Sequence, residues 1–322
     1  MAKLAVVAGA TGNVGGSVAR QLLKDGWKVS GITRNASSAS AKALTDAGAE
    51  FTSANYDDVE SLAKAFEGAN AVFGVTNIFE YLLDGTPEQA AERETNQIVN
   101  IAKAVAKVSS VEHLVLHTLP GGLKLGGEGF YCPHLDSKDK AADIIKETLP
   151  DIAKKTTFLW IGMFSSNFAA YPMMKPFEIP GSYGSHTVVF PISADSRIPF
   201  GGDVPTNVGV FVGAILAKPD VSRGKAVLVK TEDGTLQEYV QPFIDVTGRR
   251  TTILQVSLDQ YEQIYGPYGK ELGLMFKALG SNSDWAGAYS KEYDFVDAQD
   301  LGIDRSKLVK HAAAVEKDKD KF

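Results

Sequence analysis

The sequence predicts an α/β protein with a doubly wound parallel sheet and a smaller, interleaved α+β lobe. Segments with strand and helix patterns alternate regularly through the first half of the chain, which is typical of βαβ units and a parallel sheet. A glycine-rich turn separates the first expected strand, at residues 4–8, from the first expected helix, at residues 17–24. Strand, glycine turn and helix in this order are typical of a dinucleotide-binding Rossmann fold.

The composition fits a globular protein and argues against two classes of partner. The chain has 322 residues, of which 44% are hydrophobic and 22% are charged, enough for one large domain or two lobes. A formal net charge of -6 argues against direct nucleic-acid binding, which needs a basic face. No apolar run reaches the ~18 residues of a membrane span, so no membrane partner is expected.

The start of the chain and its cysteine content predict a compartment. Residues 1–3 lead directly into the first expected strand, so we expect no signal peptide. Cys132 is the single cysteine, which excludes an intrachain disulfide and a cysteine-built zinc site. We therefore expect no metal and a reduced, cytoplasmic location, with the nucleus as the alternative for a regulator.

The glycine turn is the first candidate site. Gly9, Gly12 and Gly15 are spaced three residues apart. One glycine allows the tight turn, one lets the backbone approach a pyrophosphate, and one lets helix and strand pack closely. The following helix offers free N–H groups to the phosphates. The expected cofactor-binding residues of this turn are Gly9, Thr11, Gly12, Asn13, Val14 and Gly15.

The end of the second expected strand, at residues 27–33, selects the cofactor. An acidic residue in this place binds the ribose 2′-OH of NAD, whereas a basic one accommodates the 2′-phosphate of NADP. Arg34 stands there, and the next acidic residue is Asp46. This pattern favours NADP, the alternative being a solvated arginine at a strand end.

Further strands and helices follow in order. We expect strands at 50–55, 70–76, 112–118 and 157–162, and helices at 42–47, from 56 onward and at 87–107. Ligands bind beyond the carboxyl ends of such strands. Thr76 and Asn77, at the end of one of these strands, should therefore lie beside the nicotinamide ribose.

The regular alternation of strand and helix patterns stops after Gly162. Residues 163–201 are rich in aromatic, proline, glycine and methionine residues, which fits either a lobe that covers a substrate or ordinary core packing. Helices at 206–216, 236–247 and 258–265 and strands at 226–230 and 252–257 follow, and residues 307–322 have the charge alternation of a solvated, frayed end. We expect an NAD(P)-binding Rossmann domain at 1–162 and mainly a substrate or partner lobe at 163–322, with some segments returning to the Rossmann sheet.

The segment after the fifth expected strand carries the candidate catalytic residues. Short-chain dehydrogenases pair a tyrosine with a lysine four residues later on one helix face, where the lysine holds the nicotinamide ribose and tunes the tyrosine. Here Lys138 has the right type, but His134 stands in the place of the tyrosine. His134 is either a general acid or base or a polar residue of the pocket wall. Thr118 is either a substrate-positioning hydroxyl or an ordinary strand residue, and we interpret Cys132 as structural.

These motifs together resemble the NmrA-like group of atypical short-chain dehydrogenases and, more distantly, reductases of the isoflavone reductase type that use a lysine for catalysis. The resemblance rests on Gly9 to Gly15, Thr33-Arg34-Asn35, Asp57-Asp58-x-x-Ser61-Leu62, Phe73 to Asn77, Thr118-Leu119-Pro120, His134-x-Asp136-x-Lys138 and Gly162-Met163-Phe164-x-x-Asn167-Phe168. It implies a bound NADP(H) with its adenine beside Asn55 and Tyr56. An aspartate is common in the family where this chain has Asn55.

Two functions follow from the resemblance and the residues. The first is an NADPH-dependent reductase of a carbonyl, imine or activated double bond in an apolar small molecule. The second is a non-catalytic NADP(H)-binding redox sensor or regulator that acts through a protein partner.

Overall fold

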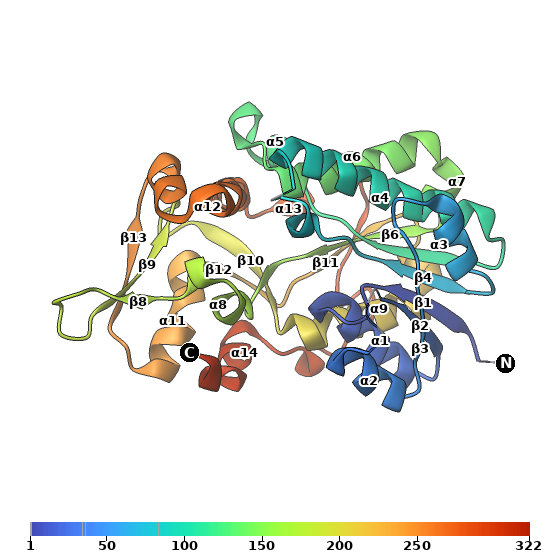
Figure 1. Cartoon of the computed structure of the whole chain (residues 1–322), viewed down its shortest axis with the longest axis horizontal. Helices are drawn as coiled ribbons and strands as arrows, with labels where there is room; N and C mark the ends of the chain where they lie inside the picture. Colours follow the sequence, from blue (N-terminus) through green and yellow to red (C-terminus); the bar gives the residue numbers. More distant parts are fainter. Residues whose placement is uncertain (1, 34, 36, 83) are drawn as a thin grey trace.

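The computed structural model describes residues 2–33, 35, 37–82 and 84–322. Its main sheet has eight parallel strands in the order β14-β11-β6-β5-β4-β1-β2-β3, which confirms the predicted doubly wound fold (Figure 1). These strands are β1 (Leu4–Ala8), β2 (Lys28–Ile32), β3 (Glu50–Thr52), β4 (Ala71–Gly74), β5 (His113–His117), β6 (Thr156–Ile161), β11 (Ala226–Val229) and β14 (Phe295–Val296).

Helices cover both faces of this sheet. One face packs against α1 (Asn13–Lys24), α2 (Ala39–Asp46) and α9 (Val204–Ala217), and the other against α3 (Val59–Ala65), α4 (Pro87–Lys107) and α6 (Pro133–Thr148) (Figure 1). The short helices α7 (Pro150–Ala153) and α10 (Pro219–Ser222) follow α6 and α9. Each face buries its own apolar cluster, which is how a parallel sheet is usually covered.

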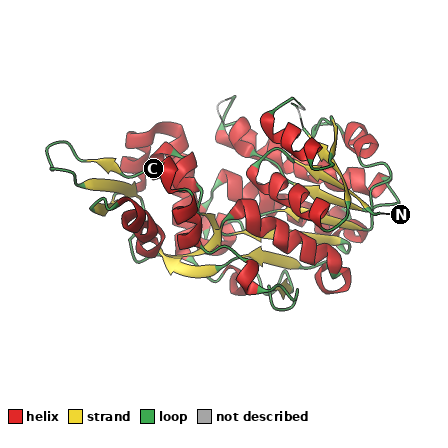
Figure 2. Cartoon of the chain, turned by 90° about the horizontal axis from the view of Figure 1, so that it is seen from below, coloured by secondary structure: helices red, strands yellow, loops and turns green. Residues whose placement is uncertain are grey.

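A smaller lobe stands beside the carboxyl ends of the strands. It contains the sheet β12-β10-β7 and the sheet β13-β9-β8. Their strands are β7 (Met163–Phe164), β8 (Phe177–Glu178), β9 (His186–Phe190), β10 (Arg197–Gly202), β12 (Glu232–Thr235) and β13 (Thr251–Gln255). Figure 2 shows this lobe from below, with the β8–β9 hairpin projecting at its far end.

Helices complete the lobe and connect it to the sheet. They are α5 (Gly122–Gly126), α8 (Asn167–Ala170), α11 (Leu236–Thr247), α12 (Leu258–Ser281), α13 (Trp285–Ala288) and α14 (His311–Lys317). Single turns of 3-10 helix are η1 (Ile78–Glu80), η2 (Glu128–Phe130), η3 (Pro172–Met174), η4 (Arg305–Lys307) and η5 (Lys319–Lys321). No helix in the described part of the chain is long and apolar enough to cross a membrane.

Two predicted elements differ from the structure by more than their bounds. The helix predicted at 258–265 is only the first arm of α12, which bends at Gly266 (φ 68°) and continues to Ser281, with Pro267 opening the second arm as prolines do at a first turn. The solvated end predicted at 307–322 is wrong for α14, although residues 316–321 are mostly exposed. His311, Ala314 and Val315 are buried in α14, because their i, i+3, i+4 spacing forms an apolar stripe.

Candidate functional site

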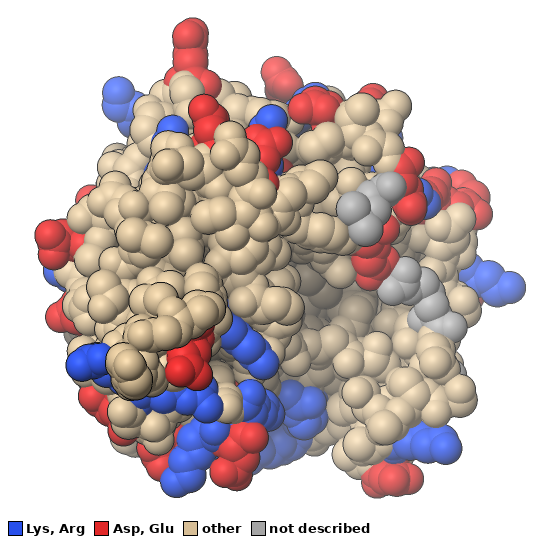
Figure 3. Space-filling model, turned by 60° about the vertical axis from the view of Figure 1, so that its left-hand side comes forward, with Lys and Arg blue, Asp and Glu red and all other residues tan. Residues whose placement is uncertain are grey.

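A large cavity in the described chain lies at the carboxyl ends of the central strands. Its volume is about 950 Å³, and its walls come from the glycine-rich loop, from the segments after β2 to β6 and from the smaller lobe. It reaches the surface as the hollow near the middle of Figure 3, where most visible wall residues are uncharged. Its position agrees with the rule for doubly wound sheets.

The glycine-rich loop has backbone geometry that only glycine supplies. Gly9 has a φ of 62°, in the left-handed region that favours glycine. A Cβ on Gly15 would lie 2.3 Å from the Gly9 carbonyl oxygen and 2.6 Å from that of Ala8, so helix and strand pack here without a side chain between them. Gly12 caps α1 without a side-chain hydrogen bond, which leaves the first amides of the helix for an anionic ligand.

Hydroxyl and amide groups after β2 form the next part of the wall. Thr33, Asn35, Ser38 and Ser40 line the cavity, and the Asn35 amide donates to Thr33 Oγ1 over 3.1 Å. Ser38 Oγ accepts from the Ala41 amide and caps α2. Arg34, on which the preference for NADP depends, lies outside the described residues.

The segment after β3 carries an ion pair that the sequence analysis missed. Asn55, Tyr56 and Asp57 line the cavity. The Asp57 carboxylate accepts from Arg93 Nη2 at 2.7 Å and from Gln97 Nε2 at 2.8 Å. The hydrogen bond from Arg93 lowers the pKa of Asp57, with burial opposing it and Gln97 adding to it. Both partners come from α4, and no residue of α4 is among the expected cofactor contacts.

Lys138 is held at the cavity wall by a fully buried carboxylate. Its Nζ donates to Glu94 Oε1 at 2.7 Å and to the His134 carbonyl at 3.3 Å, and Glu94 is 0% exposed. Thr76 Oγ1 donates to the same Glu94 oxygen at 2.8 Å, and Ser137 Oγ donates to the other at 2.6 Å. Glu94 thus joins two predicted site residues, Thr76 and Lys138, in one network.

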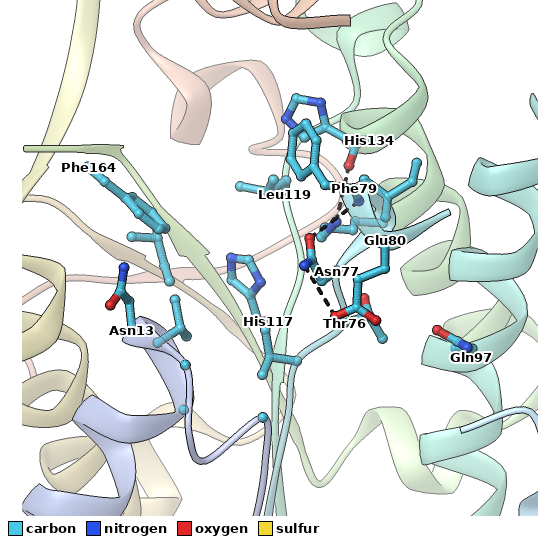
Figure 4. A pocket seen from close by; sticks show the side chains of 18 of the residues that line it. Asn13, Thr76, Asn77, Phe79, Glu80, Gln97, His117, Leu119, His134 and Phe164 are labelled. Carbon is cyan, nitrogen blue, oxygen red and sulfur yellow. Dashed lines mark hydrogen bonds between the residues drawn. The ribbon is translucent and has the colours of Figure 1, made fainter. Parts of the chain in front are cut away.

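His134 is bound by a second buried carboxylate. Its Nδ1 lies 2.9 Å from Glu271 Oε1, and its ring packs against Phe79 with centroids 5.5 Å apart. Figure 4 shows the two rings together at the upper end of the cavity. Burial alone would raise the pKa of Glu271, but the hydrogen bonds and charge of His134 outweigh burial and lower it.

Cys132 belongs to the same cluster. Among the described residues, Cys132, His134 and Glu271 form a group whose ligand atoms lie within 4.8 Å of one another, the spacing that a metal would need. Burial, together with Glu271, raises the pKa of the Cys132 thiol well above its usual value. A metal needs the thiolate, whereas here the thiol donates to Glu271 at 3.4 Å. The contacts favour a hydrogen-bonded cluster.

The end of β5 presents a histidine to the cavity and not the predicted threonine. His117 lines the cavity, and neither ring nitrogen has a hydrogen-bond partner in the described chain. Burial, with the charges of Lys138 and His134, lowers the pKa of His117 to about 3. The Thr118 hydroxyl is fully buried and accepts from Trp160 Nε1. Adjacent strand residues face opposite sides, so the structure does not bring Thr118 to the cavity.

The remaining walls combine Asn77 with an apolar surface. Asn77 Oδ1 accepts from the Phe79 amide at 3.3 Å, as the dashed lines in Figure 4 show. Opposite the nucleotide end, the apolar wall lies on the segments after β5 and β6, on α12 and on α13. It comprises Leu119, Met163, Phe164, Tyr171, Met174, Leu272, Met275, Leu279 and Trp285.

The structure gathers most of the predicted site residues around this one cavity. Its walls include the predicted residues Gly9, Thr11, Gly12, Asn13, Val14, Gly15, Asn55, Tyr56, Thr76, Asn77, His134 and Lys138. The fold and this site define a protein of the Rossmann class, with its glycine-rich loop opening onto the main cavity. The chain belongs to the NmrA-like family, whose model matches residues 1–319, as the motifs predicted.

Individual relatives match most of the chain at low identity. An NmrA-like family domain-containing protein of Dictyostelium discoideum is 27% identical over 271 residues, which cover 82% of this chain and 84% of the relative. The NmrA-like family domain-containing oxidoreductase himF of Aspergillus japonicus is 26% identical over 265 residues, covering 79% and 76%. The crystal structure of NmrA, a negative transcriptional regulator, in complex with NADP matches with a TM-score of 0.75 at 18% identity, covering 98% and 95%. This last likeness shows a shared fold.

Proposed function

We propose that this protein is an NADPH-dependent oxidoreductase that reduces a carbonyl, an imine or an activated double bond in an apolar small molecule. One observation carries the proposal. A single cavity joins the glycine-rich loop to Lys138, His134 and an apolar wall. A nucleotide fits the first end, and a group that is to be reduced fits the second. The name of the Aspergillus relative, an oxidoreductase, supports the same class.

The nucleotide end fits a dinucleotide phosphate. The uncapped start of α1 would hold the pyrophosphate. The hydroxyls of Thr33, Ser38 and Ser40 would donate hydrogen bonds to a 2′-phosphate, and Arg34 is expected to supply the charge that prefers NADP over NAD. The complex of NmrA with NADP supports an NADP-binding site.

Lys138 and His134 provide the groups for the reaction. The ammonium of Lys138 has three N–H donors, and described protein atoms accept two of them, Glu94 Oε1 and the His134 carbonyl. We assign the third to a ribose hydroxyl or to the substrate oxygen. Bound NADPH would supply the hydride, and His134 would supply the proton that completes the reduction.

The apolar wall is the feature that a nucleotide alone does not require. Met163, Phe164, Leu272, Met275 and Trp285 extend the cavity beyond Lys138. Such a surface binds an apolar compound by burial. An open apolar cavity in this place favours turnover over a purely regulatory site.

The test combines binding with turnover. Fluorescence titration should show tighter binding of NADPH than of NADH, and NADPH should be oxidised with an aromatic or aliphatic carbonyl, imine or enone from a panel. The variant Lys138→Ala should abolish this oxidation. Tighter binding of NADH contradicts the cofactor assignment. Strong NADPH binding without oxidation by any compound contradicts the enzyme and leaves the second function, an NADP(H) sensor.

The sensor hypothesis rests on the likeness to NmrA, a regulator solved with NADP. In that case the affinity of a partner protein for this chain would differ between the NADP-bound and the NADPH-bound states. Capture of the partner from a lysate at two NADP/NADPH ratios, with Gly12→Ala as the binding-deficient control, would detect this dependence.

A further inference from the structure

Glu271 makes three contacts through one carboxylate oxygen. It stands on α12, in the smaller lobe, and is 3% exposed. Its Oε1 accepts from the His134 amide at 2.9 Å, from His134 Nδ1 at 2.9 Å and from the Cys132 thiol at 3.4 Å. Glu271 therefore fixes both the backbone and the ring of His134 from a different part of the fold.

These contacts leave one nitrogen of the ring for the cavity. A carboxylate that accepts from Nδ1–H selects the tautomer or ion with a proton on Nδ1. Nε2 of His134 has no hydrogen-bond partner among the described residues, and His134 is part of the cavity wall. Phe79 packs on the ring at a centroid distance of 5.5 Å and restricts its rotation. Nε2 is thus the atom that can exchange a proton with a ligand.

The same helix also builds the substrate side of the cavity. Leu272, Met275 and Leu279 of α12 line the cavity, whereas Glu271 itself does not. Residues 271 and 275 lie one turn apart on one face. A ligand that packs against Met275 therefore contacts the helix that holds the imidazole.

We propose that Glu271 is the positioning residue that orients His134 as the proton donor of the cavity. This inference rests on the proposed reductase function. In the reaction, the protonated ring gives its Nε2 proton to the oxygen or nitrogen of the substrate, while NADPH supplies the hydride to the neighbouring carbon. The neutral ring keeps its proton on Nδ1, hydrogen-bonded to Glu271, and takes a new Nε2 proton from the solvent.

A purely structural role for Glu271 predicts a different set of results. The His134 amide lies in the first turn of α6, so Glu271 also caps that helix. Glu271→Gln keeps an oxygen that can accept from this amide but removes the charge. The cap therefore survives in this variant, and only the electrostatic effect on the imidazole is lost.

The pH profile of turnover separates the two roles. The titratable groups that act on His134 are Glu271 from α12, His117 from β5, and Cys132, Asp136 and Lys138 around its own helix. Glu271→Gln removes the carboxylate that stabilises the protonated ring. We expect kcat for NADPH oxidation to fall about 10-fold or more, its alkaline limb to move to lower pH, and KM for NADPH to stay unchanged. Glu271→Asp should recover part of kcat.

An NMR measurement tests the positioning independently of turnover. The chain has five histidines, so ¹⁵N-histidine spectra are simple, and His134→Gln identifies the His134 resonances. We expect a downfield Nδ1 proton bound to a carboxylate, which Glu271→Gln loses and the control Glu262→Gln keeps. Glu262 is on the same helix but pairs with Lys270 at the surface.

Three results would overturn the inference. The first is an unchanged His134 spectrum in Glu271→Gln, whether or not the protein turns over a substrate. The second is an active enzyme whose kcat and pH profile do not respond to this variant. The third is a stoichiometric metal ion in the purified protein, since Nδ1 would then be a metal ligand. An absence of turnover with a normal spectral response refutes the proposed function and leaves the contact itself established.

Discussion

Glu94 and Lys138 form a buried ion pair at the centre of the cavity wall, with Oε1 and Nζ 2.7 Å apart and the side chains 0% and 5% exposed. A buried charge is stable only when it is paired and hydrogen-bonded. Glu94 meets this condition, because Thr76 and Ser137 donate to it as well. The pair fixes the lysine beside the site where the resemblance places the nicotinamide ribose.

Removal of the Glu94 charge should destabilise the protein strongly. Glu94→Gln leaves the ammonium of Lys138 buried without a counter-charge, and we expect a loss of about 3–5 kcal/mol in the free energy of unfolding. Urea denaturation measures it.

The matched control is Glu316→Gln. Glu316 pairs with Lys319 at the same distance, 2.7 Å, but these side chains are 55% and 53% exposed. An exposed pair contributes about 0–1 kcal/mol. Equal losses in the two variants would show that the buried pair does not stabilise the fold as its geometry indicates.

Lys138 should contribute to NADPH binding separately from stability. In Glu94→Gln/Lys138→Met, both charges are absent, so we expect the stability to recover relative to Glu94→Gln alone. The affinity for NADPH should still fall by about 10-fold or more, since a hydrogen bond from a charged donor contributes about 1.5–3 kcal/mol. Calorimetric titration measures this affinity. Lys140→Ala, exposed on the same helix, is the control, and normal binding by the double variant would remove Lys138 from the cofactor site.

Local patterns predicted the glycine loop, Lys138 and His134 because each motif is contiguous in the chain. The carboxylates that hold these residues were not predictable in this way. Glu94 is 44 residues from Lys138, and Glu271 is 137 residues from His134. No periodicity links such positions, and a glutamate on a predicted helix is normally solvated.

One missed residue did leave a signal in the sequence. The sequence predicts that the end of the fifth strand lies near the cavity, and the alternation of strand side chains means that only one of His117 and Thr118 can face it. The register of β5 puts His117 in the cavity wall and Thr118 against Trp160. A shift of one residue along a strand reverses the face, so position alone could not decide.

Gly12 provides a direct test of the nucleotide end. A Cβ at this position would have the Gly9 carbonyl oxygen, at 3.4 Å, as its nearest neighbour, which is ordinary contact within the protein. Gly12→Ala should therefore leave the melting temperature almost unchanged, while the added methyl group crowds a pyrophosphate at the start of α1. We expect a loss of about 10-fold or more in NADPH affinity.

The control for Gly12→Ala is Gly129→Ala, where a Cβ would meet nothing within 4 Å. Calorimetric titration and thermal unfolding of both variants give the comparison. Unchanged NADPH affinity in Gly12→Ala would place the pyrophosphate elsewhere.

His117 and His113 predict how stability depends on pH. Burial, with a smaller effect of nearby positive charge, lowers the pKa of each from 6.5 to about 3. Both rings are thus neutral in the folded protein, whereas the unfolded chain binds a proton on each as the pH falls below about 6.5. The free energy of unfolding therefore decreases with falling pH, by about 1.4 kcal/mol per pH unit for each of the two histidines.

The variant His117→Phe isolates one of these two contributions. Between pH 7 and pH 5, the wild type should lose about 2 kcal/mol more of its unfolding free energy than the variant loses, because only the wild type gains the extra proton on unfolding. Asp139, whose pKa burial raises to about 6, acts in the opposite direction in both proteins and cancels in the difference. Urea denaturation at several pH values measures the two curves, with His186→Phe, at a partly buried position, as the control. Parallel curves for the wild type and His117→Phe would mean that the ring of His117 is already paired, by water or by a ligand, in the folded protein.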